Sequence, residues 1–127
     1  MEAPDFPKRI EVELSNKCNS KCIYCPRQFG IGSEGVMSFE LYKKIIDEAE
    51  SFPGMALQLH RRGESLLHPL FTVFMKYIKG KFSDVQLATN AILLDRNKAE
   101  IIAETVTFIS FSIDLPETYA VKRGVDL

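Results

Sequence analysis

The chain alternates strand-like and helix-like segments along almost its whole length, and this order constrains the fold more than any single motif. Runs of apolar and alternating residues predict strands at 9–14, 55–60, 85–90 and 106–114. Helical spacing predicts three helices and one further turn or two, at 38–52, 69–79, 95–105 and 116–124. Such alternation predicts parallel strands joined by right-handed helical crossovers.

Helix ends and buried faces can be predicted from the same segments. Ser38 and Asp95 suit N-cap positions, whereas Pro69 suits the first residue of a helix because that position needs no N–H. In the first helix, the predicted buried stripe consists of Leu41, Ile45, Ile46, Ala49 and Phe52.

The strand side chains separate into a polar and an apolar face. The polar face carries Glu11, Glu13, Gln58, His60, Gln86, Asn90, Ser110, Ser112 and Asp114. The apolar face carries Ile10, Val12, Leu14, Met55, Leu57, Leu59, Val85, Leu87, Thr107, Ile109, Phe111 and Ile113. Strands covered by helices on both faces would be apolar throughout, so we expect a curved sheet with helices outside and a polar interior. An antiparallel sheet with one solvated face is the alternative, which the intervening helices disfavour.

Chain length sets the extent of this barrel. A complete eight-unit barrel needs roughly 250 residues, or about 30 per unit, so the 127 residues of this chain hold about four units. The predicted fold class is therefore α/β, a partial parallel (βα) barrel formed by one domain that covers 1–127. In such barrels the functional loops follow the carboxyl ends of the strands, where the cysteines, "RRGES", "TNA" and "SID" all lie.

Composition limits the classes of function. The chain is 46% apolar and 26% charged, which is typical of a globular domain, and its net charge of −1 disfavours a nucleic acid or an anionic membrane as partner. No apolar run approaches the roughly 18 residues of a membrane span. The N-terminal "MEAPDFPKRI" is acidic where a secretion signal is basic. We therefore expect a cytoplasmic protein whose thiols stay reduced.

All three cysteines lie in one short segment with the spacing Cys18-x3-Cys22-x2-Cys25. A zinc ion would need a fourth ligand, which His60 or His68 could supply. A redox pair of the Cys-x-x-Cys type would leave Cys18 unused. An iron–sulfur cluster with three cysteine-bound irons and one open iron fits the count best, because an open iron can bind a substrate group.

Four short motifs lie after four successive predicted strands: "CNSKCIYC", "RRGESLLHP", "ATNA" and "FSIDLPETYAVKRG". The first, with Tyr24 before the last cysteine, resembles the signature of the radical S-adenosylmethionine (radical SAM) enzymes. The others resemble that family's Gly-Gly-Glu, Thr-Asn-Gly and Ser-Ile-Asp motifs. The resemblance extends from about Ile10 to Gly124. It is strongest to the branch with molybdopterin-precursor synthase and the peptide-modifying enzymes that carry C-terminal SPASM domains.

The resemblance implies two cofactors and a radical reaction. Cys18, Cys22 and Cys25 would bind three irons of a [4Fe–4S] cluster, and S-adenosylmethionine would chelate the fourth. An electron passed into the sulfonium would break its C–S bond and give methionine and a 5′-deoxyadenosyl radical. That radical would take a hydrogen atom from a peptide or small-molecule substrate. A reductant such as flavodoxin or ferredoxin is implied as well.

The resemblance also implies contacts to S-adenosylmethionine in the first two motifs. Tyr24 would lay its ring or backbone against the adenine, although packing beneath the loop is equally open. Gly63 would let the backbone approach the cofactor closely, and Glu64 or the Gly-Glu backbone would meet the cofactor's amino group.

The later motifs supply the remaining predicted contacts. Ser112 and Asp114 would bond the ribose hydroxyls or the methionine carboxylate, and Asn90 lies on the same polar face. Thr89 lies on the opposite face and is therefore a weaker candidate than Asn90 for a contact with S-adenosylmethionine. Because the cofactor carries the hard chemistry, substrate contacts or water-bridged struts are the roles expected of Glu11, Glu13, Gln58, His60 and Gln86.

Some features depart from the family's pattern. Arg62 replaces a glycine, and Ala91 replaces the glycine after Thr-Asn, where a positive φ would strain an alanine.

The family's core has six βα units, whereas this chain ends after the fourth strand. We therefore expect a truncated radical SAM core domain that binds a cluster but turns over S-adenosylmethionine poorly. A non-catalytic iron–sulfur or metal-binding module is the alternative. Self-association through the open edge of the fourth strand is expected to be possible.

Overall fold

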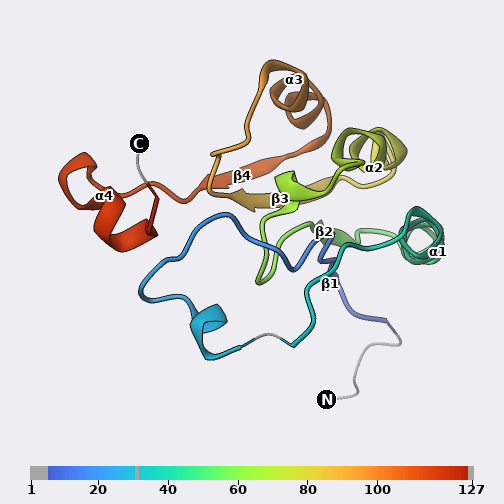
Figure 1. Cartoon of the computed structure of the whole chain (residues 1–127). Coiled ribbons are helices and arrows are strands. Elements are labelled where there is room, and N and C mark those ends of the chain that lie inside the picture. Colours follow the sequence, from blue (N-terminus) through green and yellow to red (C-terminus); the bar gives the residue numbers. More distant parts are fainter. Residues whose placement is uncertain (1–5, 31, 126–127) are drawn as a thin grey trace, which may run out of the picture.

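The computed structural model describes residues 6–30 and 32–125, which form one sheet of four parallel strands flanked by helices (Figure 1). The strands lie in chain order and are β1 (Arg9–Glu11), β2 (Ala56–Gln58), β3 (Asp84–Thr89) and β4 (Phe108–Phe111). The α-helices are α1 (Phe39–Glu50), α2 (Phe71–Ile78), α3 (Arg96–Thr105) and α4 (Pro116–Arg123). Two 3-10 helices, η1 (Pro26–Phe29) and η2 (Ser65–Leu67), lie in the connections. The predicted α/β class is confirmed.

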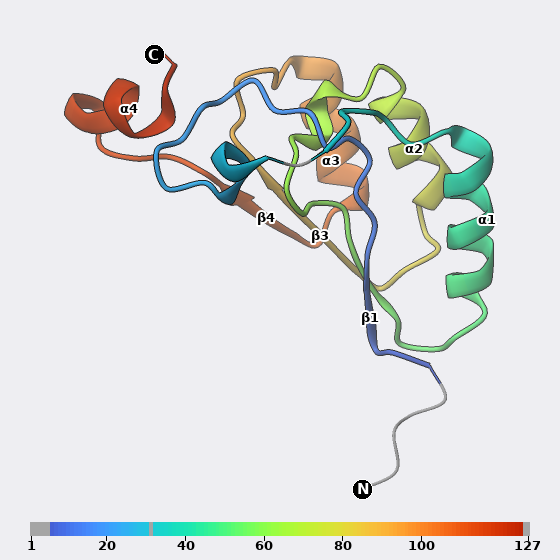
Figure 2. The same ribbon diagram turned by 60° about the horizontal axis from the view of Figure 1, so that its bottom comes forward.

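Helices α1, α2 and α3 lie along one face of the sheet, as both views show (Figures 1 and 2). Each of them follows one strand and precedes the next, which is the crossover arrangement that parallel strands require. Helix α4 lies apart from this layer, near the segment that carries the cysteines (Figure 2). The carboxyl ends of the strands therefore lead to loops at one end of the sheet, as expected for a partial barrel.

The hydrophobic core fills the space between the sheet and these three helices. Strand register places Ile10 beside Leu57 and Leu57 beside Val85, so the apolar positions of neighbouring strands form continuous rows. Leu57, Leu59 and Leu87 are fully buried. The predicted apolar face of the first three strands is therefore confirmed.

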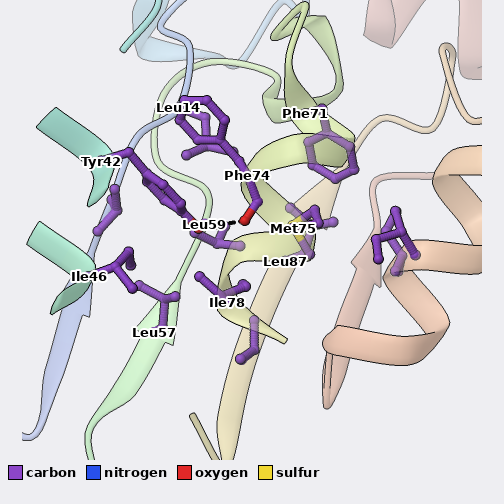
Figure 3. Packing of buried hydrophobic residues seen from close by; sticks show 14 of the residues in the cluster. Leu14, Tyr42, Ile46, Leu57, Leu59, Phe71, Phe74, Met75, Ile78 and Leu87 are labelled. Atoms are coloured by element: carbon purple, nitrogen blue, oxygen red, sulfur yellow. Dashed lines mark hydrogen bonds between the residues drawn. The ribbon is translucent and has the colours of Figure 1, made fainter. Parts of the chain in front are cut away.

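Aromatic side chains of α1 and α2 pack over this face (Figure 3). The ring centroids of Tyr42 and Phe74 lie 4.3 Å apart, and the Tyr42 hydroxyl donates to the Phe74 carbonyl at 3.4 Å. Burial raises the pKa of Tyr42 well above its ordinary range, so this hydroxyl stays a neutral donor. Burying two aromatic rings in the same layer supplies a large share of the apolar area that stabilises the fold.

Both predicted N-caps are present. The Ser38 hydroxyl accepts from the Leu41 N–H at 3.2 Å, and an Asp95 carboxylate oxygen accepts from the Lys98 N–H at 2.8 Å. The prediction for Pro69 is wrong, because α2 begins at Phe71 and the chain before it forms a turn. That turn is held by His68, whose Nδ1 accepts from the Leu70 N–H at 3.0 Å.

The predicted buried stripe of α1 is partly wrong. Leu41 is 49% exposed, and Tyr42 takes its place in the core. Phe52 lies beyond the end of the helix, where its ring stacks on Phe6 with centroids 3.6 Å apart. Ile46 and Ala49 are buried as predicted. Tyr42, one position further along the helix than Leu41, reaches the core with its large ring, and Leu41 points outward.

Strands β1, β2 and β4 are shorter than predicted, whereas β3 keeps its predicted length. β1 is short because its hydrogen-bond partners change. After Glu11 the Val12 N–H still donates to the Gln58 carbonyl at 2.8 Å. The Leu14 carbonyl then accepts from Met37, and Ser15 forms an antiparallel bridge to Val36. The first strand therefore ends as a parallel strand well before residue 14.

Strand β4 does not share the burial of the other three. Phe111 is 45% exposed and Ile113 is 67% exposed, although both were assigned to the apolar face. The physical reason is that α4 leaves the sheet instead of covering these side chains (Figure 1). The prediction of a buried apolar face is therefore wrong for Phe111 and Ile113, whereas Ile109 packs against the core.

Parts of two predictions lie outside the described residues. Residues 1–5 contain half of the N-terminal segment that disfavoured a secretion signal, and residues 126–127 contain the chain end. Within the described parts of the chain, no helix has the length and apolar character that crossing a bilayer requires.

Candidate functional site

The cysteine loop, defined as residues 15–30, leaves the end of β1 and ends in the 3-10 helix η1. Cys25 is the N-cap residue of η1, and its N–H donates to the Cys22 carbonyl at 3.0 Å. Arg27 donates to the Asn16 carbonyl and pairs with Glu34 at 3.1 Å, so its side chain ties the end of the loop to its beginning. The loop is therefore closed on itself without a disulfide, and all three cysteines are free.

The three cysteines line one cavity of about 520 Å³. Each cysteine is partly exposed to this space. The remaining lining residues are Ser20, Lys21, Arg27, Gln28, Gly30, Gly32 and Glu34. In residues 6–30 and 32–125, no group of three or more His, Cys, Asp or Glu side chains lies close enough together to hold a metal ion. The three cysteines thus line the same cavity without lying close enough together to hold a single metal ion.

Two of the sulfurs receive N–H groups from the protein. The Cys18 sulfur lies 3.5 Å from the Ser20 backbone nitrogen and 3.8 Å from the Asn90 side-chain nitrogen. The Cys22 sulfur lies 3.9 Å from an Arg123 nitrogen. Such donors stabilise thiolate sulfur, which is the form that binds metals. Burial nevertheless raises the pKa of the Cys18 thiol, and the Ser20 N–H only partly offsets this effect. Metal binding at Cys18 would therefore release a proton.

Gly63 lies where the loop after β2 presses against the start of the cysteine loop. A Cβ atom at this position would lie 1.9 Å from the Ser15 carbonyl oxygen, so only glycine fits. The neighbouring Glu64 N–H donates to the Lys17 carbonyl at 2.7 Å, and a Glu13 carboxylate oxygen accepts from the Gly63 N–H at 2.9 Å. Gly63 was predicted to permit close approach to the cofactor, and here it permits close approach of the protein's own backbone.

The Glu64 carboxylate is buried and joins the loops that follow β2 and β3. It accepts from the Leu66 N–H at 3.0 Å, the Thr89 hydroxyl at 2.7 Å and the Asn90 N–H at 2.8 Å. The side chain is only 3% exposed, so these donors are needed to compensate for the loss of hydration. Thr89 is buried as well. The sequence placed Thr89 correctly on the face opposite Asn90 but missed that both contact the same carboxylate.

Asn90 connects this carboxylate to the cysteine loop. Its side-chain nitrogen donates to the Asn19 side chain at 2.8 Å and to the Ser20 hydroxyl at 3.0 Å. The following residue, Ala91, has a φ of 61°, which is the left-handed conformation that strains an alanine. Ala91 thus has the positive φ that was considered for the glycine position of the Thr-Asn-Gly motif.

Tyr24, Asp114 and Arg123 form a second cluster on the far side of the loop. The Tyr24 hydroxyl donates to Asp114 at 3.1 Å, and the Arg123 Nε donates to the same carboxylate oxygen at 2.6 Å. The Arg123 guanidinium also lies 5.3 Å from the centroid of the Tyr24 ring. Burial acts to raise the pKa of Asp114, but the hydrogen bonds from Arg123 and Tyr24 outweigh it and lower the pKa. Sequence reasoning did not single out Arg123, because nothing in its local sequence links it to the cysteines.

The structure therefore brings most of the predicted site residues to the cysteine loop. Gly63 contacts its beginning, Asn90 contacts its middle, and Asp114 is hydrogen-bonded to Tyr24 within it. Ser112 lies beside them, since its N–H donates to the Thr89 carbonyl at 2.8 Å.

The two histidines considered as zinc ligands are both bonded within the protein. His68 is buried, its Nε2 lies 2.8 Å from the Met37 carbonyl, and its Nδ1 accepts from Leu70. The Nδ1 of His60 accepts from the Ala88 N–H at 3.0 Å. His68 therefore has no ring nitrogen left for a metal, whereas His60 keeps its Nε2.

Polar side chains of the predicted interior connect neighbouring strands and loops. Glu11 pairs with Arg61 at 3.0 Å, and the Gln58 amide nitrogen donates to the Gln86 amide oxygen at 3.2 Å. The Gln58 amide oxygen is buried without a partner in the described part of the chain. These contacts are the struts expected for this face, and one buried acceptor remains open.

The structure thus combines parallel βα units with a three-cysteine loop that follows the carboxyl end of the first strand. The sequence matches the radical SAM superfamily over residues 12–124. The chain therefore belongs to this superfamily. Its members bind a [4Fe–4S] cluster and S-adenosylmethionine, which are the two cofactors predicted from the sequence.

The curated relatives lie in the predicted branch. The chain is 31% identical over 113 residues to the tungsten-containing aldehyde ferredoxin oxidoreductase cofactor-modifying protein of Pyrococcus furiosus. It is 30% identical over 122 residues to GTP 3′,8-cyclase of Heliobacterium modesticaldum, and 27% identical over 97 residues to the subtilosin biosynthesis protein AlbA of Bacillus subtilis. The matches cover 87%, 90% and 76% of this chain but only 32%, 37% and 21% of those relatives.

Solved structures confirm the fold. BtrN in complex with AdoMet and 2-DOIA superposes with a TM-score of 0.73 at 25% identity, over 84% of this chain and 46% of BtrN. SuiB of Streptococcus suis bound to its precursor peptide SuiA superposes with a TM-score of 0.80 at 17% identity. That match covers 95% of this chain and 28% of SuiB, and it supports the fold alone. The chain thus has the architecture of part of a radical SAM barrel.

Proposed function

We propose that this chain is the part of a radical SAM enzyme that binds the [4Fe–4S] cluster and S-adenosylmethionine. The observation that carries the proposal is the cavity of about 520 Å³ lined by three free cysteines at the carboxyl ends of parallel strands. Cys18, Cys22 and Cys25 would bind three irons, and one iron would stay open to S-adenosylmethionine. One relative is named as an enzyme, GTP 3′,8-cyclase, which does not favour a non-catalytic module.

The residues around the cavity suit this cluster. Soft thiolates are the ligands that iron–sulfur clusters prefer, and hydrogen bonds to sulfur help to set the cluster's reduction potential. Asn90 and Ser20 supply such donors at Cys18, and Arg123 supplies one at Cys22. The three cysteine sulfurs thus suit a [4Fe–4S] cluster in ligand type and number, and the nearby N–H groups suit it as well.

We further propose which groups contact S-adenosylmethionine. The Glu64 carboxylate already accepts three hydrogen bonds from the protein, so the backbone carbonyl oxygens of Gly63 and Glu64 are the better candidates to accept from the cofactor's amino group. The Ser112 hydroxyl is the candidate for the ribose or the methionine carboxylate. Tyr24 is 54% exposed, which leaves a ring face for the adenine. Asp114 and Asn90 would then orient the loop beside the cofactor.

When bound, the cluster supplies the electron that cleaves S-adenosylmethionine to methionine and a 5′-deoxyadenosyl radical. The residues of this chain hold the cofactors and face the substrate from the polar side of the sheet. The Gln58 amide oxygen is one open acceptor there, and His60 can donate from Nε2 because its Nδ1 accepts from Ala88. These groups are candidates for hydrogen bonds to a polar substrate.

The substrate is proposed to be a peptide or a small molecule. SuiB was solved with the precursor peptide SuiA, AlbA acts in subtilosin biosynthesis, and BtrN was solved with the small molecule 2-DOIA. A flavodoxin or ferredoxin remains the proposed reductant, and a cytoplasmic location remains a prediction. Because the chain spans a fifth to two fifths of the curated relatives' lengths, we expect little 5′-deoxyadenosine from the chain alone.

Anaerobic reconstitution with iron and sulfide, followed by electron paramagnetic resonance (EPR), tests the proposal. We expect a reduced [4Fe–4S] signal that changes when S-adenosylmethionine is added. Cys22→Ser should lose most of the bound iron, whereas His60→Ala should keep it. Bound zinc that is lost in His60→Ala, or a cluster signal that ignores S-adenosylmethionine, would contradict the proposal.

A further inference from the structure

Arg123 reaches the Cys22 sulfur from the last turn of α4, 101 residues further along the chain. Its side chain is only 13% exposed. One guanidinium nitrogen lies 3.9 Å from the Cys22 sulfur, and the Nε donates to Asp114 at 2.6 Å. A long cationic side chain is thus held in one position between a metal-ligand sulfur and a carboxylate.

The backbone fixes the position of Arg123 independently of its side chain. The Lys21 N–H donates to the Arg123 carbonyl at 2.9 Å, and the Ile23 N–H donates to the Lys122 carbonyl at 3.0 Å. Gly124 ends the helix in the left-handed conformation, and a Cβ atom there would lie 2.8 Å from the Lys21 carbonyl oxygen. The end of α4 therefore stays against the cysteine loop when the arginine side chain is replaced.

Asp114 and Tyr24 restrict the guanidinium further. Asp114 bonds the Nε and leaves the outer nitrogens directed toward Cys22, while the Tyr24 ring lies 5.3 Å from the guanidinium carbon. Lys122 lies near the same carboxylate at 3.7 Å, but its side chain is 42% exposed and it contacts no cysteine sulfur that the structure describes. Arg123 differs from this neighbour in its contact with sulfur and in its burial.

We propose that Arg123 is a positioning residue for the cluster, which holds the Cys22 thiolate in place and raises the reduction potential of the bound cluster. The inference rests on the proposed function, because it needs a cluster bound at Cys22. Reduction adds one electron, supplied by an external reductant, and makes the cluster more negative. A partly buried cation that donates to a ligand sulfur stabilises the reduced form more than the oxidised form.

The test is a redox titration of the reconstituted chain with dithionite, monitored by EPR, together with iron analysis. Arg123→Met should keep the iron content of the parent and lower the midpoint potential. We expect about a tenfold change in the relative stability of the two redox states, which is about 59 mV for a one-electron couple. Arg123→Lys should lower the potential less, because it keeps the positive charge. It should still lower it, because its single nitrogen cannot bond Asp114 and Cys22 together.

Two control variants separate this contact from general charge. Lys122→Met removes a neighbouring charge that does not contact sulfur, and Arg96→Met removes an arginine whose side chain is 88% exposed on α3. Both should shift the potential much less than Arg123→Met. Equal shifts in Lys122→Met and Arg123→Met overturn the proposal, and so does a parent-like potential in Arg123→Met.

Two further outcomes are distinguishable. If Arg123→Met does not retain iron, the midpoint potential of Arg123→Lys is the test instead. A parent-like potential in Arg123→Lys overturns the proposal. If the parent chain itself binds no cluster, the proposed function fails first. A parent chain that binds a cluster, with potentials that are independent of Arg123, overturns only this inference.

Discussion

The two sides of this molecule are stabilised in different ways. Between the sheet and helices α1 to α3, side chains such as Leu57, Ile46 and Phe74 are fully buried. Around the cysteine loop and α4, large apolar side chains remain exposed, and they include Ile23 at 58%, Leu115 at 62% and Val121 at 73%. Packing stabilises the first side, whereas hydrogen bonds and close backbone contacts hold the second.

This difference shows how a cofactor loop can be positioned without a core of its own. Gly63 and Gly124 let two other segments press against the loop, and Glu64 joins the loops after β2 and β3. Each such contact depends on one atom or one hydrogen bond, whereas a core residue contacts many neighbours. The core should therefore respond to lost volume, and the cysteine side should respond to added volume and to lost hydrogen bonds.

The largest expected effect is in the core. Phe74→Ala removes a fully buried ring of α2 that packs against Tyr42 of α1, so the free energy of unfolding should fall by about 4 kcal/mol. Val73→Ala is the control in the same helix, because Val73 is 43% exposed, and it should change stability by less than about 0.5 kcal/mol. Urea unfolding followed by circular dichroism measures both. Equal effects at the two positions would argue against the described packing.

The next effect is at the contact between two loops. Gly63→Ala would place a Cβ atom 1.9 Å from the Ser15 carbonyl, and the backbone must shift to relieve it. We expect a loss of about 3 kcal/mol in urea unfolding, together with reduced iron binding on reconstitution. Gly35→Ala is the matched control, because its Cβ would meet no atom within 4 Å. Parent-like stability in Gly63→Ala would contradict the close approach.

A smaller effect is expected from the buried carboxylate. Glu64→Gln replaces one acceptor oxygen by an NH2 group, which faces either the donors of Leu66 and Thr89 or the donor of Asn90, so stability should fall by about 2 kcal/mol. Glu40→Gln, on an exposed position of α1, should change stability by less than about 0.5 kcal/mol. Urea unfolding measures both variants. An unchanged free energy of unfolding in Glu64→Gln would show that these hydrogen bonds contribute little to stability.

The smallest effect has the opposite sign. Ala91 has a φ of 61°, so Ala91→Gly should relieve backbone strain and raise the free energy of unfolding by about 1 kcal/mol. Ala99→Gly, at an exposed position within α3, should lower it by about 1 kcal/mol. The pair is compared by thermal unfolding, and destabilisation by both variants would refute the strained turn.

The packed side was largely predictable from the sequence. Alternation along each strand placed Leu57, Leu59 and Leu87 in the core, and residue type alone identified the Ser38 and Asp95 caps. These predictions succeeded because periodicity and capping depend on neighbouring residues. The exchange of Leu41 for Tyr42 could not be predicted, since it depends on the room left by α2.

The candidate site was predictable in its residues but not in their contacts. The motifs gave the cysteines, Gly63, Glu64 and Asn90, yet not that the Glu64 carboxylate faces Thr89 and Asn90 instead of open space. Arg123 was missed because its partner, Cys22, is 101 residues away in the sequence, and the local sequence pattern does not indicate contacts between such distant residues. Long-range polar contacts of this kind become visible only when the fold is known.

Mössbauer spectroscopy of the chain reconstituted with ⁵⁷Fe tests the central claim most directly. The claim is that three cysteines hold a [4Fe–4S] cluster and leave one iron open to S-adenosylmethionine. We predict that adding S-adenosylmethionine changes the parameters of one iron in four and leaves the other three unchanged. Four irons that stay equivalent when the cofactor is added would contradict the account.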